Sequence, residues 1–193
     1  GLVRAITEQG SFRERSGTGL RRRPMALVRH GHRILIGGPS GLAAIPHNVS
    51  EGVPRSIRED LFVTSLLSVR DRLFVGTFDR GVLLFEGDSL GGQPSEQFFD
   101  GARISGFCAS NERVWVFGPE NFVARIDGDR PQEIDVIPEG LSSNSISALA
   151  LDNDGRLWVG HLRAGVDVLS PVGRIESVSL GRESEDRSAE VEA

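Results

Sequence analysis

Short apolar stretches recur along the chain at a nearly constant spacing. Four of them open with an arginine, and they occupy residues 33–37, 72–76, 113–117 and 156–160. Their starting arginines are 39, 41 and 43 residues apart, and the third position is always large and apolar: Leu35, Phe74, Trp115 and Trp158. No long part of the chain shows the 3.6-residue period of an amphipathic helix, so the stretches are predicted to be β-strands.

Each of these stretches has further predicted strands around it. One precedes it, at 25–29, 63–69, 104–109 and 146–151, and one follows it, starting at Gly41, Gly81, Phe122 and Gly165. The turns at 29–32, 70–71, 110–112 and 152–155 hold Gly, Asn, Asp and His residues, which tolerate the positive φ of hairpin turns. Outer strands are predicted at 95–99, 133–137 and 174–180. Four short strands in every ~42 residues are typical of a β-propeller blade.

The repeat predicts an all-β chain, a β-propeller with about four complete four-stranded antiparallel blades. The blades are expected at 24–58, 59–100, 101–141 and 142–181, and residues 1–23 resemble the outer two strands of a preceding blade. A propeller leaves no exposed sheet edge only when it closes. Residues 1–181 are therefore expected to be a segment of a larger propeller, which would associate, swap or unfold unless completed.

Composition and charge exclude some functions. The formal net charge is −5, of which −3 belongs to the polar, acidic residues 182–193, predicted to be a flexible tail. The remaining chain is nearly neutral, whereas a nucleic-acid-binding domain is usually basic, so no nucleic-acid partner is expected. Cys108 is the only cysteine, which rules out an intrachain disulfide and a Cys-rich metal site. No apolar run approaches the ~20 residues of a membrane helix, and no membrane contact is expected.

One copy of the repeat has a recognisable family pattern. Residues 144–160 read NSISALALDNDGRLWVG and closely resemble the two-component regulator propeller repeat, N-x-I-x-x-L-x-x-D-x-x-G-x-L-W-[IV]-G-T, followed by G-G-L where this chain has 164–166. The other copies match more loosely, and Phe117 and Phe122 stand where the rest have glycine. The resemblance implies the ligand-sensing, extracytoplasmic (periplasmic) part of a bacterial sensor protein, often ahead of a membrane span and a histidine kinase. A cytoplasmic location stays open.

Ligands of propellers generally bind on the face that carries the loops between second and third strands and the crossovers between blades. The candidate ligand-binding residues on that face are Arg23, Arg80, Arg103, Glu120, Asn121, Asn144, His161 and Arg163. Four converging arginines would suit a carboxylate or a sugar acid, because the guanidinium fork pairs bidentately with such groups. In the alternative interpretation these are solvated surface residues, paired with Asp60, Asp79 and Glu120.

Other residues are predicted to be structural. The arginines at 33, 72, 113 and 156 are expected to lay their stems on apolar surface and keep their heads in water. Residues 152–155 are predicted to form a hairpin turn, because an EF-hand calcium loop would need a third oxygen ligand and a glutamate at its twelfth position. The four histidines, at 30, 32, 47 and 161, lack metal-site spacing, and Cys108, Trp115 and Trp158 are predicted core residues. No metal and no cofactor is expected.

Three functions remain open on the sequence. The preferred one is a non-catalytic signalling module that senses a small molecule or a glycan, or binds a protein partner, together with the remaining propeller blades. The second is an enzyme resembling the streptogramin lyases, propellers of similar repeat type, for which His161 and Glu120 are the only pair that could be nominated. The third is a structural scaffold that only holds partners together. The first is preferred because the sequence shows no catalytic constellation.

Overall fold

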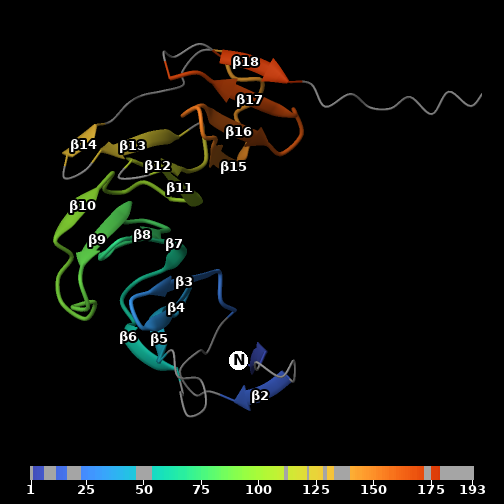
Figure 1. The fold of residues 1–193 in the computed structure, drawn as a ribbon. Helices are drawn as coiled ribbons and strands as arrows, with labels where there is room; N and C mark the ends of the chain where they lie inside the picture. The colour runs from blue at the N-terminus through green and yellow to red at the C-terminus, as the bar shows by residue number, and fades with distance from the viewer. Residues whose placement is uncertain are drawn as a thin grey trace, which may run out of the picture.

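Each repeat folds into one antiparallel sheet. The computed structural model describes residues 2–6, 12–16, 23–46, 54–110, 113–120, 122–127, 130–132, 140–171 and 175–178. All regular elements within these ranges are β-strands, and they form four four-stranded sheets and one two-stranded sheet (Figure 1). No membrane-spanning helix occurs in the part of the chain that the structure describes.

The strands follow one another in sequence order within every sheet. The two-stranded sheet pairs β1 (Leu2–Ile6) with β2 (Phe12–Ser16). The next sheet contains β3 (Ala26–His30), β4 (Arg33–Gly38), β5 (Gly41–Pro46) and β6 (Arg55–Arg58). The second blade contains β7 (Val63–Val69), β8 (Arg72–Thr77), β9 (Val82–Glu86) and β10 (Glu96–Phe98). The third contains β11 (Gly106–Ser110), β12 (Arg113–Phe117), β13 (Val123–Asp127) and β14 (Arg130–Gln132), and the fourth β15 (Ile146–Leu151), β16 (Leu157–His161), β17 (Val166–Leu169) and β18 (Ile175–Val178).

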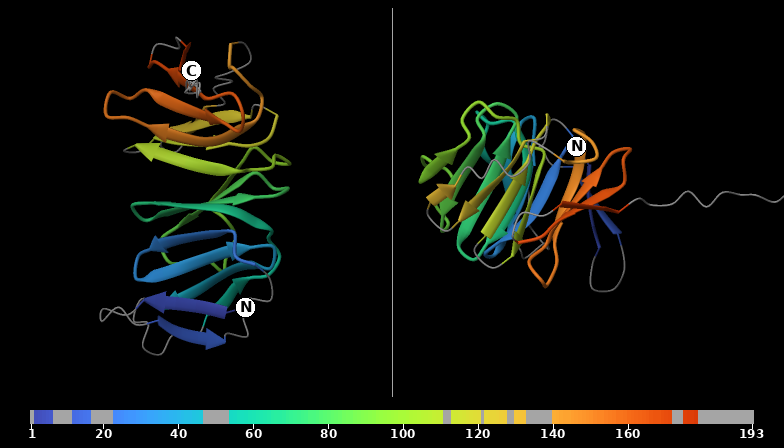
Figure 2. Two further views of the ribbon diagram at one scale, coloured as in Figure 1. Left: turned by 90° about the vertical axis from the view of Figure 1, so that its right-hand side faces the viewer. Right: turned by 90° about the horizontal axis from the view of Figure 1, so that it is seen from above.

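The sheets are arranged as the blades of a propeller. The first strands of successive blades, β3, β7, β11 and β15, contact one another, and the fourth strands β6, β10, β14 and β18 form the outer edges. Figure 1 shows the blades along an arc that stays open on one side, and Figure 2 shows them stacked in chain order. The predicted fold is therefore confirmed. The chain is an all-β partial propeller, whose described sheets do not close into a ring.

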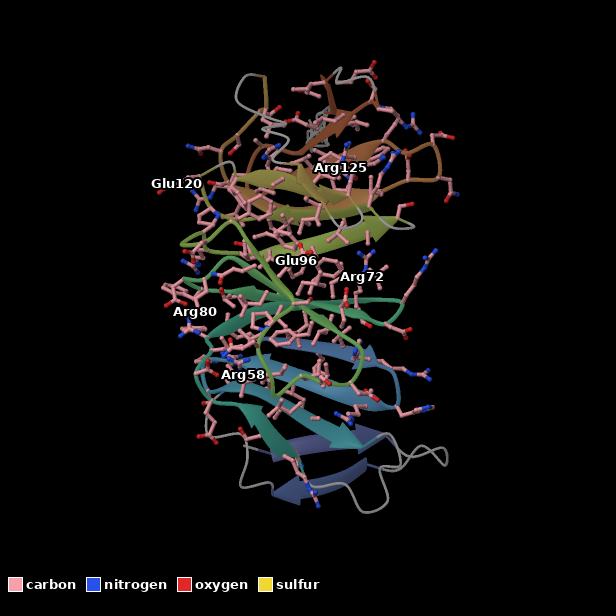
Figure 3. All side chains as sticks on the ribbon, turned by 90° about the vertical axis from the view of Figure 1, so that its left-hand side faces the viewer. Arg58, Arg72, Arg80, Glu96, Glu120 and Arg125 are labelled. Carbon is pink, nitrogen blue, oxygen red and sulfur yellow. The ribbon has the colours of Figure 1, made fainter. Side chains whose placement is uncertain are left out.

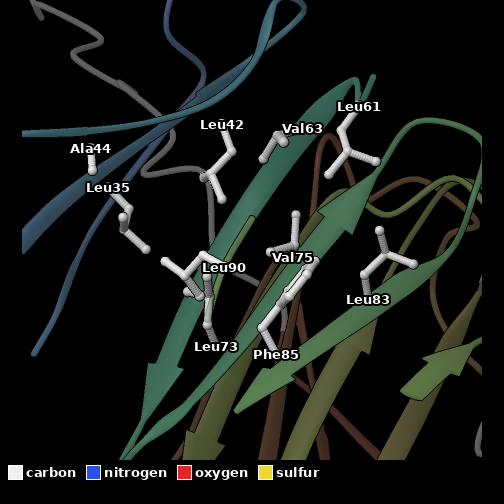
Figure 4. Packing of buried hydrophobic residues seen from close by; sticks show 10 residues of the cluster. All are labelled: Leu35, Leu42, Ala44, Leu61, Val63, Leu73, Val75, Leu83, Phe85 and Leu90. Atoms are coloured by element: carbon white, nitrogen blue, oxygen red, sulfur yellow. The ribbon is translucent and has the colours of Figure 1, made fainter. Parts of the chain in front are cut away.

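The hydrophobic core is divided among the spaces between blades. Figure 4 shows the cluster between the first two blades, made of Leu35, Leu42, Ala44, Leu61, Val63, Leu73, Val75, Leu83, Phe85 and Leu90. In the next space Phe74 packs against Val114 and Val116, and in the third Trp115 packs against Leu157 and Val159. The large residue at the third position of the second strand thus faces the following blade, which ties each blade to its neighbour.

Some predicted details fall differently in the structure. The fourth strand of the third blade is at Arg130–Gln132, whereas the residues 133–137 predicted for it lie outside the described ranges. Trp158 is half-buried and not a core residue, because it faces away from the third blade and no described blade covers it. His47 and the predicted tail 182–193 also lie outside the described ranges, and the limits between blades stay predictions.

Candidate functional site

The loops between second and third strands lie beside the crossovers between blades. In the second blade, the amide of Phe78 in such a loop donates a hydrogen bond to the carbonyl of Phe62 in the preceding crossover. Figure 3 shows Arg80 and Glu120, from two of these loops, at one edge of the blades, and Arg72 toward the opposite edge. We call the surface formed by these loops and crossovers the loop face.

Buried hydrogen bonds fix the loop of the second blade. Thr77 is fully buried, and its Oγ1 donates to the carbonyl of Gly81 at 2.8 Å and accepts from the amide of Arg80 at 2.8 Å. Gly81 has a φ of 64°, and a Cβ at this position would collide with the carbonyl oxygen of Phe99. Only glycine fits there. The loop consequently turns tightly and leaves Phe78 and Arg80 exposed.

Two phenylalanines and two arginines form one patch on the loop face. The rings of Phe62 and Phe78 stack with their centroids 5.0 Å apart, and the guanidinium of Arg103 lies 4.8 Å from the centroid of Phe78. Such a cation–π contact is worth about 0.5–1 kcal/mol at an exposed site. Phe78 nevertheless keeps 43% of its surface exposed. The amide of Gly81 donates a hydrogen bond to the carbonyl of Ala102. This bond places Arg80, the residue before Gly81, near Arg103. We call Phe62, Phe78, Arg80 and Arg103 the arginine–aromatic patch.

Asp60 partly compensates the charge of this patch. It accepts two hydrogen bonds from Arg58, at 2.9 and 2.7 Å, and Arg80 Nη1 lies 3.4 Å from its Oδ2. The hydrogen bonds from Arg58 are the main reason why the pKa of Asp60 is lowered to about 2. The side chains of Arg80 and Asp60 are each about half exposed, and exposed ion pairs contribute little to stability. Arg80 is therefore held weakly and stays accessible.

The other candidate residues lie on separate blades. Arg23 precedes the first blade, Glu120 is in the loop of the third, and Asn144 and Arg163 belong to the fourth, and all four are exposed. Glu120 has a φ of 58°, which is uncommon for a residue other than glycine. Asn121 lies outside the described residues. The structure thus brings Arg80 and Arg103 together, but not all four arginines.

His161 is buried inside the fourth blade. Its Nε2 lies 2.8 Å from Asp167 Oδ2, and both side chains are fully buried. Asp167 also accepts hydrogen bonds from the amide and the hydroxyl of Ser142, each at 2.7 Å. Burial raises the pKa of Asp167, but the hydrogen bonds from Ser142, Ser177 and His161 together outweigh it and hold that pKa at about 2. His161 therefore pairs with Asp167 and not with Glu120, which leaves the nominated catalytic pair without a geometric basis.

The hairpin at 152–155 uses its first carboxylate internally. Asp152 accepts hydrogen bonds from Trp158 Nε1, from Arg156 Nε and from the amides of Asp154 and Arg156. The bond from Trp158 is the main cause that lowers the pKa of Asp152 to about 2. The carboxylate therefore holds the turn, as expected for a structural hairpin.

Metal and thiol chemistry find no support in the described residues. No group of three or more His, Cys, Asp or Glu side chains in these ranges is placed to hold a metal ion. Burial raises the pKa of the Cys108 thiol to about 12, so it is not ionised near neutral pH.

Sequence reasoning missed two arrangements. It singled out Arg80 and Arg103 but not the rings of Phe62 and Phe78 beside them, although Phe78 directly follows a strand. It also missed His30, which is buried and bridges two blades, with Nδ1 2.9 Å from Ser68 Oγ and Nε2 3.0 Å from the carbonyl of Gly87. Both arrangements join segments that are distant in sequence, so only the fold reveals them.

A protein-family comparison identifies one of the repeats. Residues 140–163 match the family model described as two component regulator propeller. The chain carries a two-component regulator propeller repeat. This regulator-propeller repeat includes the Asp152 hairpin, Trp158 and the buried His161. No curated protein matches the chain.

Solved structures share the fold at low sequence identity. The extracellular domain of BT4673 from B. thetaiotaomicron, described as a hybrid two component system, aligns over 88% of this chain with 17% identity and a TM-score of 0.67. The chain spans only 23% of that domain. The computationally designed Ika4 protein aligns over 80% of this chain and 95% of its own, with 16% identity and a TM-score of 0.59. For the designed Ika8 protein the shares are 82% and 49%, with 17% identity and a TM-score of 0.58. These neighbours show that the chain shares a propeller-type fold, and the family match identifies one of its repeats.

Proposed function

We propose that the chain is part of the ligand-sensing propeller of a bacterial signalling protein and works outside the cytoplasm. The regulator-propeller repeat and the likeness to an extracellular sensor domain support this role. We take the module to be non-catalytic, because the nominated histidine is committed to Asp167 inside a blade. Propeller blades beyond this arc would complete the sensor.

The arginine–aromatic patch carries the proposal for ligand binding. Arg103 lies over the ring of Phe78, and no ion pair joins it to an acidic side chain within the described residues. A guanidinium pairs bidentately with a carboxylate, and an exposed ring offers a flat apolar surface. The ligand class that fits is a small molecule or glycan with a carboxylate next to a ring.

A thermal-shift experiment tests this function. The folded chain is heated with glucuronate, galacturonate and benzoate, each paired with its neutral counterpart. A ligand that binds only the folded state stabilises it by about 2.7 kcal/mol at a concentration of 100 Kd. We expect the melting temperature to rise with at least one acid and not with its neutral counterpart.

Two variants locate the binding. Arg103→Ala should abolish the shift. Arg113→Ala should keep it, because Arg113 is an exposed arginine at the end of β12 that is remote from the loop face. A shift that survives in Arg103→Ala, or the absence of a shift with every acid, would contradict a carboxylate site at this patch.

A further inference from the structure

Arg58 binds the carboxylate that lies beside the arginine–aromatic patch. Its Nε and Nη2 donate hydrogen bonds to the two oxygens of Asp60. Arg80 of the patch reaches the same carboxylate through a single contact of 3.4 Å. The side chain of Arg58 is 11% exposed, whereas the side chains of Asp60 and Arg80 are about half exposed. One carboxylate thus lies between two guanidinium groups and is bound mainly by the more buried one.

The pKa of Asp60 shows the same difference between the two arginines. Among the interactions that lower it to about 2, the hydrogen bond from Arg58 is the largest and the charge of Arg80 is the smallest. Asp60 therefore depends little on Arg80. The guanidinium of Arg80, which makes one long contact with Asp60, remains available for a carboxylate from solution.

A loop of the second blade contacts Arg58 from the neighbouring blade. Residues 87–95 join β9 to β10, and we call them the strap. Leu90 of the strap is 1% exposed and packs in the core between the first two blades (Figure 4). The carbonyl of Gly92 accepts a hydrogen bond from Arg58 Nη1 at 2.6 Å, and the guanidinium lies 5.8 Å from the centroid of the Phe85 ring. The strap thus belongs to the second blade but holds an arginine of the first.

The ends of the strap are attached to the blades, whereas its middle is exposed. The carbonyl of Gly87 lies 3.0 Å from His30 Nε2 of the first blade, and the amide of Ser95 donates a hydrogen bond to the carbonyl of Leu84 at 2.8 Å. Between these ends, residues 91–93 are exposed. The part of the strap that binds the arginine is therefore accessible from solution.

Loss of the bonds from Arg58 would turn Asp60 into a competitor of the ligand. Its carboxylate would keep its charge near neutral pH, and the cation that already contacts it is Arg80. A guanidinium fork pairs with a carboxylate through two parallel hydrogen bonds. Arg80 paired with Asp60 in this way would be closed to the carboxylate of a ligand.

We propose that Arg58 is a positioning residue of the ligand site, which engages Asp60 so that Arg80 stays available, and which is itself held by the strap. The inference rests on the proposed function, because it concerns how the arginine–aromatic patch stays open to an acid. It adds a point of regulation, because withdrawal of the Gly92 carbonyl from Arg58 lowers the affinity of the patch for that acid. The strap therefore ties ligand affinity to the contact between the first two blades.

Chemical modification of Arg80 tests this role in the ligand-free chain. Phenylglyoxal reacts with the neutral form of a guanidinium, and a paired carboxylate slows the reaction because it stabilises the charged form. Arg58→Gln should slow the modification of Arg80, measured by mass spectrometry of its peptide, by about two- to fivefold, the effect of one exposed ion pair. Adding Asp60→Asn to the same chain should restore the rate. Arg55→Gln, at an exposed position of the same strand, is the matched control and should leave the rate unchanged.

Binding of an acid links this effect to the ligand site. Glucuronate, galacturonate and benzoate are titrated into each variant by calorimetry. Arg58→Gln should weaken the acid that binds the wild type by the same factor, and Asp60→Asn should restore its affinity in the double variant. A loss that Asp60→Asn does not restore would overturn the inference, because Arg58 would then only support the fold. If no acid binds the wild type, the proposed function fails, whereas an unchanged rate of Arg80 modification in Arg58→Gln refutes the role of Arg58 alone.

Two leucine variants test the strap. Leu90→Ala removes the buried side chain of the strap, and Leu83→Ala removes one of β9 in the same core cluster. We expect only Leu90→Ala to slow the modification of Arg80, because only this variant loosens the strap that holds Arg58. Equal rates in the two variants would overturn the role of the strap. In any chain that circular dichroism shows to be unfolded, valine replaces alanine, and Arg58→Lys replaces Arg58→Gln because an ammonium group lacks the fork that binds both oxygens.

Discussion

At the scale of single residues, the third blade shows how the repeat tolerates a departure from its pattern. The last apolar position of the second strand is glycine in three blades, and its partner in the first strand is small: Ala26 with Gly37, Ser65 with Gly76, and Ala148 with Gly160. In the third blade Phe117 takes the place of glycine, and its register partner is Gly106. In this blade the glycine is on the first strand instead of the second, and it leaves room for the ring of Phe117.

Gly106→Ala tests this compensation. A Cβ at Gly106 would lie 2.6 Å from Phe117 Cε1, so the ring must shift. Overpacking of this kind costs about 1–3 kcal/mol, which we expect as a loss in the free energy of unfolding in urea. Adding Phe117→Leu to the same chain should recover part of the loss, because the effects of substitutions at contacting residues on the free energy of unfolding are not additive. A neutral single variant would show that Phe117 does not need the glycine.

His30 gives a second prediction at this scale. Replacing it with alanine removes both of its hydrogen bonds between blades and leaves the carbonyl of Gly87 without that donor. A buried group left unpaired costs about 1–3 kcal/mol, so His30→Ala should lower the free energy of unfolding by that amount. The matched control is His32→Ala, two residues away and exposed, which should change it by less than about 0.5 kcal/mol. Equal effects of the two variants would refute the bridging role.

At the scale of elements, hydrogen bonds join the crossover before the fourth blade to its third strand. Ser142 in the crossover donates twice to Asp167 on β17. The carboxylate must be ionised to accept all of its bonds, which is the reason that its pKa lies below the ordinary value of 3.8, at about 2. The attachment of this crossover therefore depends on pH.

The sign of this dependence follows from proton linkage. A carboxyl group whose folded-state pKa is lowered contributes stability that is complete above about pH 4 and is lost as the pH falls toward 2. We expect the unfolding free energy of the wild type to fall more steeply between pH 4 and pH 2 than that of Asp167→Asn. Asp79→Asn, in an exposed loop, should keep the wild-type slope. Parallel profiles for all three proteins would argue against this role of Asp167.

The strands also show which elements a sequence can predict. In the second blade the second and third strands are buried on both faces and read as apolar runs, so their places follow from composition alone. The fourth strands lie at the outer edge, and two of them, Arg55–Arg58 and Arg130–Gln132, contain mostly polar residues or proline. Their pairing comes from the neighbouring strand, and for this reason the sequence did not locate them.

At the scale of the whole molecule, the repeat predicts the propeller but not which loops meet. Arg23 and Arg163 were expected to converge with Arg80 and Arg103, yet they lie at the first and the fourth blade. The arc separates them, and its curvature is set by packing between blades. The burial of His161 likewise depends on Asp167 in the adjacent strand. The pairing of β16 with β17 sets this neighbour, and the sequence around His161 does not reveal it.

The half-buried Trp158 has a practical consequence for spectroscopy. The chain contains two tryptophans and no tyrosine, so its near-ultraviolet emission comes from two indole rings. Trp115 lies between the third and fourth blades, whereas Trp158 lies on the side of the fourth blade that faces away from the third. A soluble quencher should reach Trp158 more readily, and any partner that covers this ring should shift its emission to shorter wavelength. The protein thus carries an intrinsic optical probe at the end of its arc.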